Sequence, residues 1–125
     1  MNKLQIDGEI IFEDKIRHTP SGLVVQRFKI EHQSLQTEAN LGVGVIINTS
    51  SSVDHNVEID DGAHICPGVS IAGNVNIGKK SWVGIGTSII QGINIGDDAI
   101  IGAGSVVIND IPDKSRVAGV PAKPI

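Results

Sequence analysis

The sequence predicts an all-β protein in which a parallel β-helix of six-residue repeats follows an amino-terminal β-hairpin. From Ile47 onward every sixth residue is Ile or Val, and the residue four places after each of these, up to Ser105, is small or β-branched. Only 2% of the residues are aromatic whereas Gly numbers 15, so the core has to be built from aliphatic side chains. Both observations favour a repeated β-structure.

The period of six decides the architecture of the repeat. It matches neither a helix of about 3.6 residues per turn nor a long strand alternation, but it suits short strands separated by regular corners. Three repeats close a triangular coil of 18 residues, and coils stack about 4.8 Å apart, so residues i and i+18 form columns. The β-branched series is Ile47, Val53, Ile59, Ile65, Ile71, Ile77, Val83, Ile89, Ile95, Ile101 and Val107.

The corners of this coil are expected directly after the β-branched positions. Gly or Asp often stands there, as in Ile77-Gly78, Val83-Gly84 and Val53-Asp54. These residue types tolerate turn conformations that most others avoid.

The chain before Leu41 lacks the period. Leu4–Ile11 and Leu23–His32 read as strands joined by a turn at Thr19–Gly22. We therefore expect a hairpin segment at 1–40, the β-helix at 41–110, and an extended tail at 111–125 that caps the last coil, since this tail breaks the period with prolines and small residues.

Composition limits the possible functions. The net charge of −4 provides no basic footprint for nucleic-acid phosphates. Cys66 is the only cysteine, so no intrachain disulfide can form, and its place after a core isoleucine favours a structural role. With no CxxC, HExxH or P-loop we expect no metal site. A cytoplasmic protein is expected, because no signal peptide or membrane-spanning apolar run is evident.

Several motifs of the repeat carry a family resemblance. They are Ile47-Asn48-Thr49, Val53-Asp54-His55-Asn56, Ala63-His64-Ile65-Cys66-Pro67-Gly68, Ala72-Gly73-Asn74-Val75, Trp82-Val83-Gly84-Ile85-Gly86, Gly102-Ala103-Gly104-Ser105 and Ala118-Gly119-Val120-Pro121-Ala122-Lys123. Through them, Ile46–Ile125 resembles hexapeptide-repeat sugar O- and N-acyltransferases of the sialic-acid O-acetyltransferase and bacillosamine N-acetyltransferase type. The resemblance implies a left-handed coil, a homotrimer, acetyl-CoA as acyl donor and a sugar amine or hydroxyl as acceptor. It does not extend to the βαβ nucleotide-sugar domain that usually precedes this repeat.

Acyl transfer from a thioester needs a base for the nucleophile's proton and donors for the developing oxyanion. The resemblance makes His55 the general base, and the Asp54 carboxylate can orient its ring if the turn brings the two together. Gly73 lies one coil after His55, so its N–H is a candidate oxyanion donor. From spacing alone, His55 can equally be a solvated turn residue and Gly73 a plain corner glycine.

Other candidate contacts surround this pair. His64 follows His55 by half a coil, so the two rings should meet only across subunits, and the resemblance places His64 and Gly73 on the acyl-CoA. The resemblance also suggests that Ile85 and Ala103 line the pantetheine groove with backbone groups. Asn48 is open between turn capping and a substrate contact, and His64 between a ligand contact and a surface corner residue.

The first forty residues carry a second resemblance, through Asn2, Leu4, Gly8, Arg17, Pro20-Ser21-Gly22, Phe28, Glu31-His32, Ser34, Gln36, Glu38 and Ala39. They resemble the amino-terminal part of primosomal replication protein N, a single-stranded-DNA-binding OB-fold protein. An OB barrel needs five strands, and this chain changes to the repeat after about three. The segment holds five basic and six acidic residues, which does not favour nucleic-acid binding.

The leading hypothesis is an acetyl-CoA-dependent acetyltransferase that acts directly on an amino or hydroxyl group of a sugar, with His55 as base. The first alternative is a non-catalytic chimeric β-helix scaffold. The second is a single-stranded nucleic-acid-binding protein that acts through its amino-terminal segment.

Overall fold

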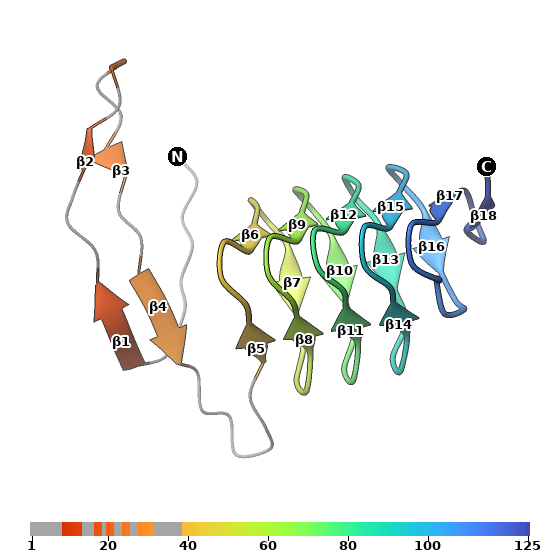
Figure 1. The fold of residues 1–125 in the computed structure, drawn as a ribbon, viewed down its shortest axis with the longest axis horizontal. Helices are drawn as coiled ribbons and strands as arrows, with labels where there is room; N and C mark the ends of the chain where they lie inside the picture. Colours follow the sequence, from red (N-terminus) through yellow and green to blue (C-terminus); the bar gives the residue numbers. More distant parts are fainter. Residues whose placement is uncertain (1–8, 14–16, 19, 22–23, 26–27, 32–38) are drawn as a thin grey trace. The chain divides into compact units, whose positions relative to one another are not determined.

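The computed structural model describes residues 9–13, 17–18, 20–21, 24–25, 28–31 and 39–125. The chain divides into two compact units, one containing Gln5–Glu38 and the other containing Ala39–Ile125 (Figure 1). Within the described residues every regular element is a β-strand. The same residues contain no helix long and apolar enough to cross a membrane.

The first unit is built from antiparallel pairs. β1 (Glu9–Glu13) pairs with β4 (Phe28–Glu31), and β2 (Arg17–His18) pairs with β3 (Val24–Val25). A turn at Pro20 and Ser21 lies between β2 and β3, where the Pro-Ser-Gly sequence predicts it. The predicted hairpin is therefore confirmed, although Leu4–Gly8 and His32 lie outside the described residues.

The second unit is a parallel β-helix with three faces, each a sheet of stacked two-residue strands. The serine face consists of β7 (Ser52–Val53), β10 (Ser70–Ile71), β13 (Ser88–Ile89) and β16 (Val106–Val107). The asparagine face consists of β5 (Asn40–Leu41), β8 (Glu58–Ile59), β11 (Asn76–Ile77) and β14 (Asn94–Ile95). The tryptophan face consists of β6 (Ile46–Ile47), β9 (His64–Ile65), β12 (Trp82–Val83), β15 (Ile100–Ile101), β17 (Arg116–Ala118) and β18 (Lys123–Pro124).

Strands on each face pair in the predicted register of 18 residues. Ile71 lies beside Val53 on one side and Ile89 on the other, so the β-branched residues stack in columns. The all-β left-handed parallel β-helix of hexapeptide repeats, preceded by a hairpin, is confirmed. Its rhythm follows from strands too short to alternate more than once before the next corner.

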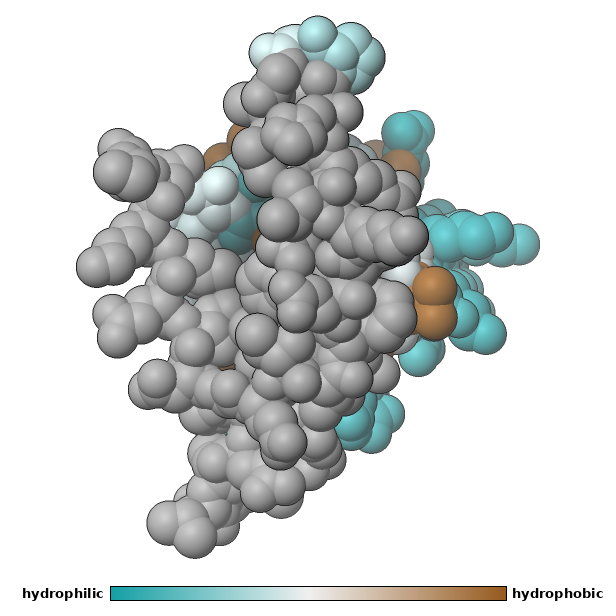
Figure 2. All heavy atoms as spheres, turned by 90° about the vertical axis from the view of Figure 1, so that its left-hand side faces the viewer, coloured by the Kyte–Doolittle hydropathy of each residue, from teal (hydrophilic) through white to brown (hydrophobic). Residues whose placement is uncertain are grey.

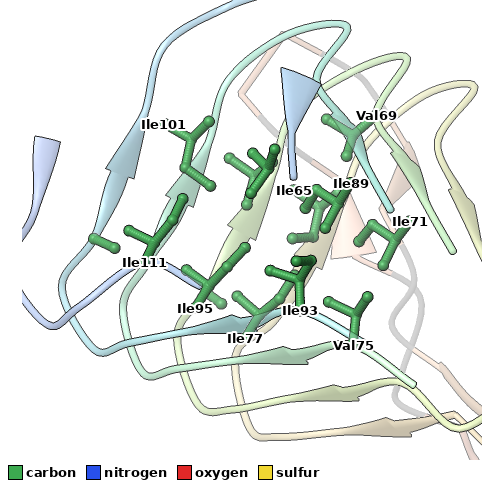
Figure 3. Packing of buried hydrophobic residues seen from close by; sticks show 14 of the residues in the cluster. Ile65, Val69, Ile71, Val75, Ile77, Ile89, Ile93, Ile95, Ile101 and Ile111 are labelled. Atoms are coloured by element: carbon green, nitrogen blue, oxygen red, sulfur yellow. The ribbon is translucent and has the colours of Figure 1, made fainter. Parts of the chain in front are cut away.

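The core contains both sets of predicted inward positions. Ile65, Ile77 and Ile101 are at most 1% exposed, and Val69 and Val75, from the second set, are fully buried (Figure 3). Ile47 belongs to the same series but is 38% exposed, because β6 is the edge strand of its sheet. Viewed along the long axis, the coloured side chains that project outward are mostly hydrophilic (Figure 2).

Three polar side chains lie in this core, and each has a backbone acceptor. Ser81 Oγ donates to the Gly96 carbonyl at 2.7 Å, Ser105 Oγ donates to the Gly102 carbonyl at 2.6 Å, and Thr87 Oγ1 lies 3.4 Å from the same oxygen. Satisfied hydroxyls of this kind can be buried at little cost. They replace the β-branched residue at the inward position beside a corner.

The predicted position of the tight turns is wrong by two residues. Left-handed φ values occur three residues after each Ile or Val position, not directly after it: Gly44, Ser50, Asn56, Gly62, Gly68, Asn74, Lys80, Gly86, Gly92, Asp98 and Gly104. Gly78 and Gly84 are needed for a different reason, because a Cβ there would stand within 2.6 Å of backbone atoms of the next coil. Their requirement is close approach of the coils, not an unusual φ.

Parallel pairing continues past the expected boundary at 110. Ile111 makes a bridge with Ile95, and Arg116 pairs with Ile100, a register of 16 residues instead of 18. Ile111 and Val117 are buried, so they close the core with a shortened coil. The chain reverses only afterwards, where β18 pairs antiparallel with β17.

Candidate functional site

His55 lies in the corner that connects the serine face to the asparagine face, and we call residues 54–57, 72–75 and 90–93 the His55 corner. Its backbone N–H donates to Asp54 Oδ1 at 2.8 Å, which is the local bond by which Asp initiates turns. Asn56 follows with φ 55°, a conformation that Asn accepts more readily than most residues. The Asp-His-Asn sequence thus forms the corner and leaves the imidazole exposed.

Gly73 occupies the same position one coil later, directly against the His55 ring. A Cβ at Gly73 would stand 2.6 Å from Cε1, 2.8 Å from Nε2 and 3.1 Å from Nδ1 of His55. Those distances are far below van der Waals contact for carbon and nitrogen, so only glycine lets the ring rest on this backbone. The two residues that the sequence predicts as base and oxyanion donor therefore meet within one chain.

The ring is contacted by Asn56 and not by Asp54. Nδ1 lies 3.3 Å from Asn56 Oδ1, whereas the Asp54 carboxylate accepts the His55 backbone N–H. The condition attached to Asp54, that the turn bring its carboxylate to the ring, gains no support from these contacts. Sequence reasoning missed Asn56 as a ring partner, although its place at the left-handed position after His55 is a usable signal.

The backbone of Gly73 offers a free donor toward this corner. Its carbonyl accepts the Gly92 N–H at 3.1 Å, while its own N–H has no acceptor within the described part of the chain. At the corresponding corner positions the preceding side chain caps the N–H, as Asp54 caps His55 and Asn48 caps Thr49. Ala72 precedes Gly73 and has no oxygen to do so. The uncapped N–H can therefore bind a ligand oxygen.

A groove of about 540 Å³ begins at this corner and extends over the serine face. Its floor follows from the small outward side chains of Ser52, Ser70 and Ser88. Asp54, Ala72, Ile90 and Gln91 line its corner side, and Val53, Ile71 and Ile89 complete the lining. The imidazole and the Gly73 N–H thus lie beside an open, partly polar channel.

Ile85 and Ala103 lie at a second corner, which connects the tryptophan face to the serine face. The Ile85 carbonyl accepts the Gly104 N–H at 2.7 Å, so the backbone groups left for a ligand at these two positions are their N–H groups. The Ile85 side chain is 60% exposed. Asn48 belongs to this corner too, where its Oδ1 accepts the Thr49 N–H at 2.8 Å. It caps a turn, and it lies at a different corner from His55.

His64 lies on β9 of the tryptophan face, the face that does not adjoin the His55 corner. Its ring stacks on Trp82 of the next coil, with centroids 4.3 Å apart and planes tilted by 47°. Its Nε2 is buried and finds no hydrogen-bond partner among the described residues. Within one chain the two histidines therefore belong to opposite sides of the coil.

Cys66 takes no part in either corner's chemistry. The side chain is 3% exposed, and burial raises the pKa of its thiol. A neutral, enclosed thiol is a poor nucleophile. The described residues also contain no group of three or more His, Cys, Asp or Glu side chains that could hold a metal.

A triangular β-helix with an imidazole, an uncapped N–H and a groove at one corner defines a class of acyl-transfer scaffold, and solved structures identify its relatives. Perosamine N-acetyltransferase from Caulobacter crescentus, solved as a histidine-to-asparagine mutant with CoA and GDP-perosamine, is 34% identical with a TM-score of 0.65 over 70% of this chain and 50% of that one. The acetyltransferase domain of PglB from Neisseria gonorrhoeae, also solved with acetyl coenzyme A, is 41% identical with a TM-score of 0.65 over 70% and 45%. Serine acetyltransferase from Neisseria gonorrhoeae is 35% identical with a TM-score of 0.65 over 70% and 39%.

These comparisons confirm the resemblance of the repeat to hexapeptide-repeat acetyltransferases. This chain spans half or less of the length of each of these relatives. A family model described as another single-strand binding protein family matches residues 2–53, fewer than half of the chain. A comparison with curated protein sequences finds no match.

Proposed function

We propose that this chain is an acetyl-CoA-dependent acetyltransferase whose acceptor is an amino or hydroxyl group of a sugar. The observation that carries the proposal is the imidazole of His55 lying on Gly73, whose N–H is uncapped, at the end of an open groove. A base and an oxyanion donor within one corner are the two groups that direct acyl transfer requires.

In the proposed reaction, His55 accepts the proton of the acceptor's amine or hydroxyl as that group attacks the thioester carbonyl carbon. The carbonyl oxygen becomes an oxyanion and accepts a hydrogen bond from the Gly73 N–H. When the tetrahedral intermediate collapses, the carbon–sulfur bond breaks, and the imidazolium returns its proton to the departing CoA sulfur. The acetyl group never becomes attached to the protein, in keeping with the buried Cys66 thiol.

The donor's pantetheine arm is assigned to the second corner. The N–H groups of Ile85 and Ala103 point to it because no described residue accepts them, and amides of the arm need donors of this kind. Asp54 positions the His55 backbone in this proposal, and Asn48 supports the second corner by capping its turn.

A homotrimer completes the site in the proposal, with His64 of one subunit beside the acyl donor at the His55 corner of the next. The buried, unpartnered Nε2 of His64 supports a covering partner. So does the apolar outer column of the tryptophan face, where Trp82 is 47% exposed between other large side chains.

Calorimetric titration of the purified full chain with acetyl-CoA tests the donor site. We expect saturable binding that weakens at least about tenfold in His64→Ala, because a ligand contact is lost. Asn76→Ala, on the asparagine face away from both corners, is the matched control and should bind normally. Absence of binding by a folded trimer would reject the enzyme in favour of the scaffold alternative.

Single-strand nucleic-acid binding is the second candidate, favoured by the family match over residues 2–53. Fluorescence anisotropy with a labelled oligothymidylate at two salt concentrations tests it. Binding that weakens steeply with salt would support this function, since phosphate contacts release counterions. Salt-independent or undetectable binding would remove it.

A further inference from the structure

The identity of the base atom depends on which nitrogen of His55 carries the proton. A neutral imidazole has one N–H and one nitrogen lone pair, and only the unprotonated nitrogen can accept a proton. The partner of the other nitrogen decides between the two tautomers. At His55 the nearest polar side-chain atom belongs to Asn56.

Asn56 Oδ1 lies 3.3 Å from Nδ1 of His55. An amide oxygen is only an acceptor, so this contact requires the proton on Nδ1. The lone pair then lies on Nε2, which is 2.8 Å from the Cβ position of Gly73 and thus faces the backbone with the uncapped N–H. The two contacts assign opposite tasks to the two ring nitrogens.

The corner holds Asn56 in place for this contact. Asn56 adopts φ 55°, a left-handed position shared with Asn74 one coil later, and Asp54 holds the preceding backbone through the His55 N–H. Side chains of both neighbours therefore fix His55, Asp54 through its backbone and Asn56 through its ring. Asn74 has the same backbone conformation, and the residue before it is Gly73, which has no ring to orient.

We infer that Asn56 is a positioning residue that holds His55 in the Nδ1–H tautomer and so makes Nε2 the base. The inference rests on the proposed function for its consequence in catalysis, but the tautomer itself is a property of the unliganded protein. The contact is between neutral groups, so Asn56 selects a tautomer without adding a charge next to the ring.

Long-range nitrogen–proton NMR of the imidazoles, at a pH where they are neutral, tests the inference on the full chain. The His55 signals are assigned by their loss in His55→Gln. We expect Asn56→Gly to lower the ratio of Nδ1–H to Nε2–H tautomer about fivefold, the worth of one net neutral hydrogen bond. Asn56→Asp keeps an acceptor and should retain the ratio, while Asn74→Gly should leave it unchanged.

An unchanged ratio in Asn56→Gly, or an Nε2–H tautomer in the unsubstituted protein, would overturn the inference. Glycine accepts the left-handed φ at position 56, so the variant should keep its fold, which circular dichroism checks. If the chain transfers acetyl groups, kcat of Asn56→Gly should fall by the same factor with unchanged acetyl-CoA affinity. A tautomer shift without any transferase activity would refute the proposed function and leave the role of Asn56 intact.

Discussion

The imidazole of His55 lies on the backbone of Gly73, so close that a methyl group at position 73 would stand 2.6 Å from Cε1. The two residues are 18 apart, one turn of the coil, and the peptide N–H after Gly73 donates to the His55 carbonyl at 3.0 Å. This contact places an aromatic base above a peptide whose N–H is uncapped. It is the relationship on which the proposed chemistry depends.

Replacing Gly73 by alanine should displace the His55 ring. The backbone at 73 needs no left-handed φ and the ring is exposed, so the ring can move and stability should change by less than about 0.5 kcal/mol. Misplacing a base by about 1 Å costs about 100-fold in rate, and kcat of acetyl transfer measures it. Full activity in Gly73→Ala would contradict the assigned geometry.

The double variant His55→Ala with Gly73→Ala separates the displaced ring from any direct loss at the Gly73 N–H. If Gly73→Ala acts only through the ring, it should cost nothing further once the ring is absent. An additional loss in the double variant would assign a separate role to position 73.

Gly84 and Gly86 should respond differently to substitution. A Cβ at Gly84 would meet the Ala103 nitrogen and the Ile101 carbonyl at 2.6 Å, so Gly84→Ala should cost about 3 kcal/mol by forcing two coils apart. Gly86 has φ 67° and open space around it, so Gly86→Asn should cost only about 1 kcal/mol. Urea denaturation measures both, and equal costs would refute the close-approach explanation.

Truncation of the core should be expensive on the inner side of a strand and cheap on the outer side. Ile77 is 1% exposed, and Ile77→Ala should cost about 3 kcal/mol for lost burial and the cavity left behind. Ile100→Ala, on the outer side of β15, should cost less than about 1 kcal/mol in the monomer. Similar unfolding midpoints for the two variants would be inconsistent with the assigned inward series.

The buried Ser81 hydroxyl should matter more than its size suggests. It donates to the Gly96 carbonyl at 2.7 Å and accepts the Ala99 N–H at 3.1 Å. Ser81→Ala leaves both backbone groups unpaired, and we expect a loss of about 2 kcal/mol. Thr87→Val is the control, since the Thr87 hydroxyl has only a 3.4 Å contact, and it should cost less than about 1 kcal/mol.

Cys66 should be unreactive in the folded protein. Burial raises the pKa of its thiol, so modification by a disulfide reagent at pH 8 should be at least about 100-fold slower than in urea. Because the folded pKa is raised, the associated stability is present below the unfolded pKa and is lost as pH rises through the folded one. Rapid labelling of the native protein would show that the thiol is accessible.

Much of the fold follows from the sequence because a regular period leaves few alternatives. Ile65 and Val69 are buried where the spacing of six and the offset of four put them. The turn positions could not be read in the same way. Gly78 and Gly84 look like turn glycines, but their demand comes from the next coil, which a local sequence pattern does not contain.

The candidate site divides along the same line. Stacking of His55 on Gly73 is a consequence of the 18-residue period and was predicted. The partner of the ring was not, because Asp54 and Asn56 flank His55 symmetrically in sequence, and only the course of the corner sends the carboxylate to the backbone and the amide to Nδ1. The separation of Asn48 from His55 likewise depends on which corner each residue occupies.

The sequence by itself determined the repeating coil, the aliphatic core and the column that joins His55 to Gly73, since each depends only on spacing along the chain. Tertiary structure decided which side chain holds the imidazole, which N–H groups remain uncapped, and where the groove opens. It also shortened the last coil, so that Arg116 pairs with Ile100 after 16 residues. These features depend on distances of a few ångströms between neighbouring coils, and no periodicity in the sequence encodes distances at that scale.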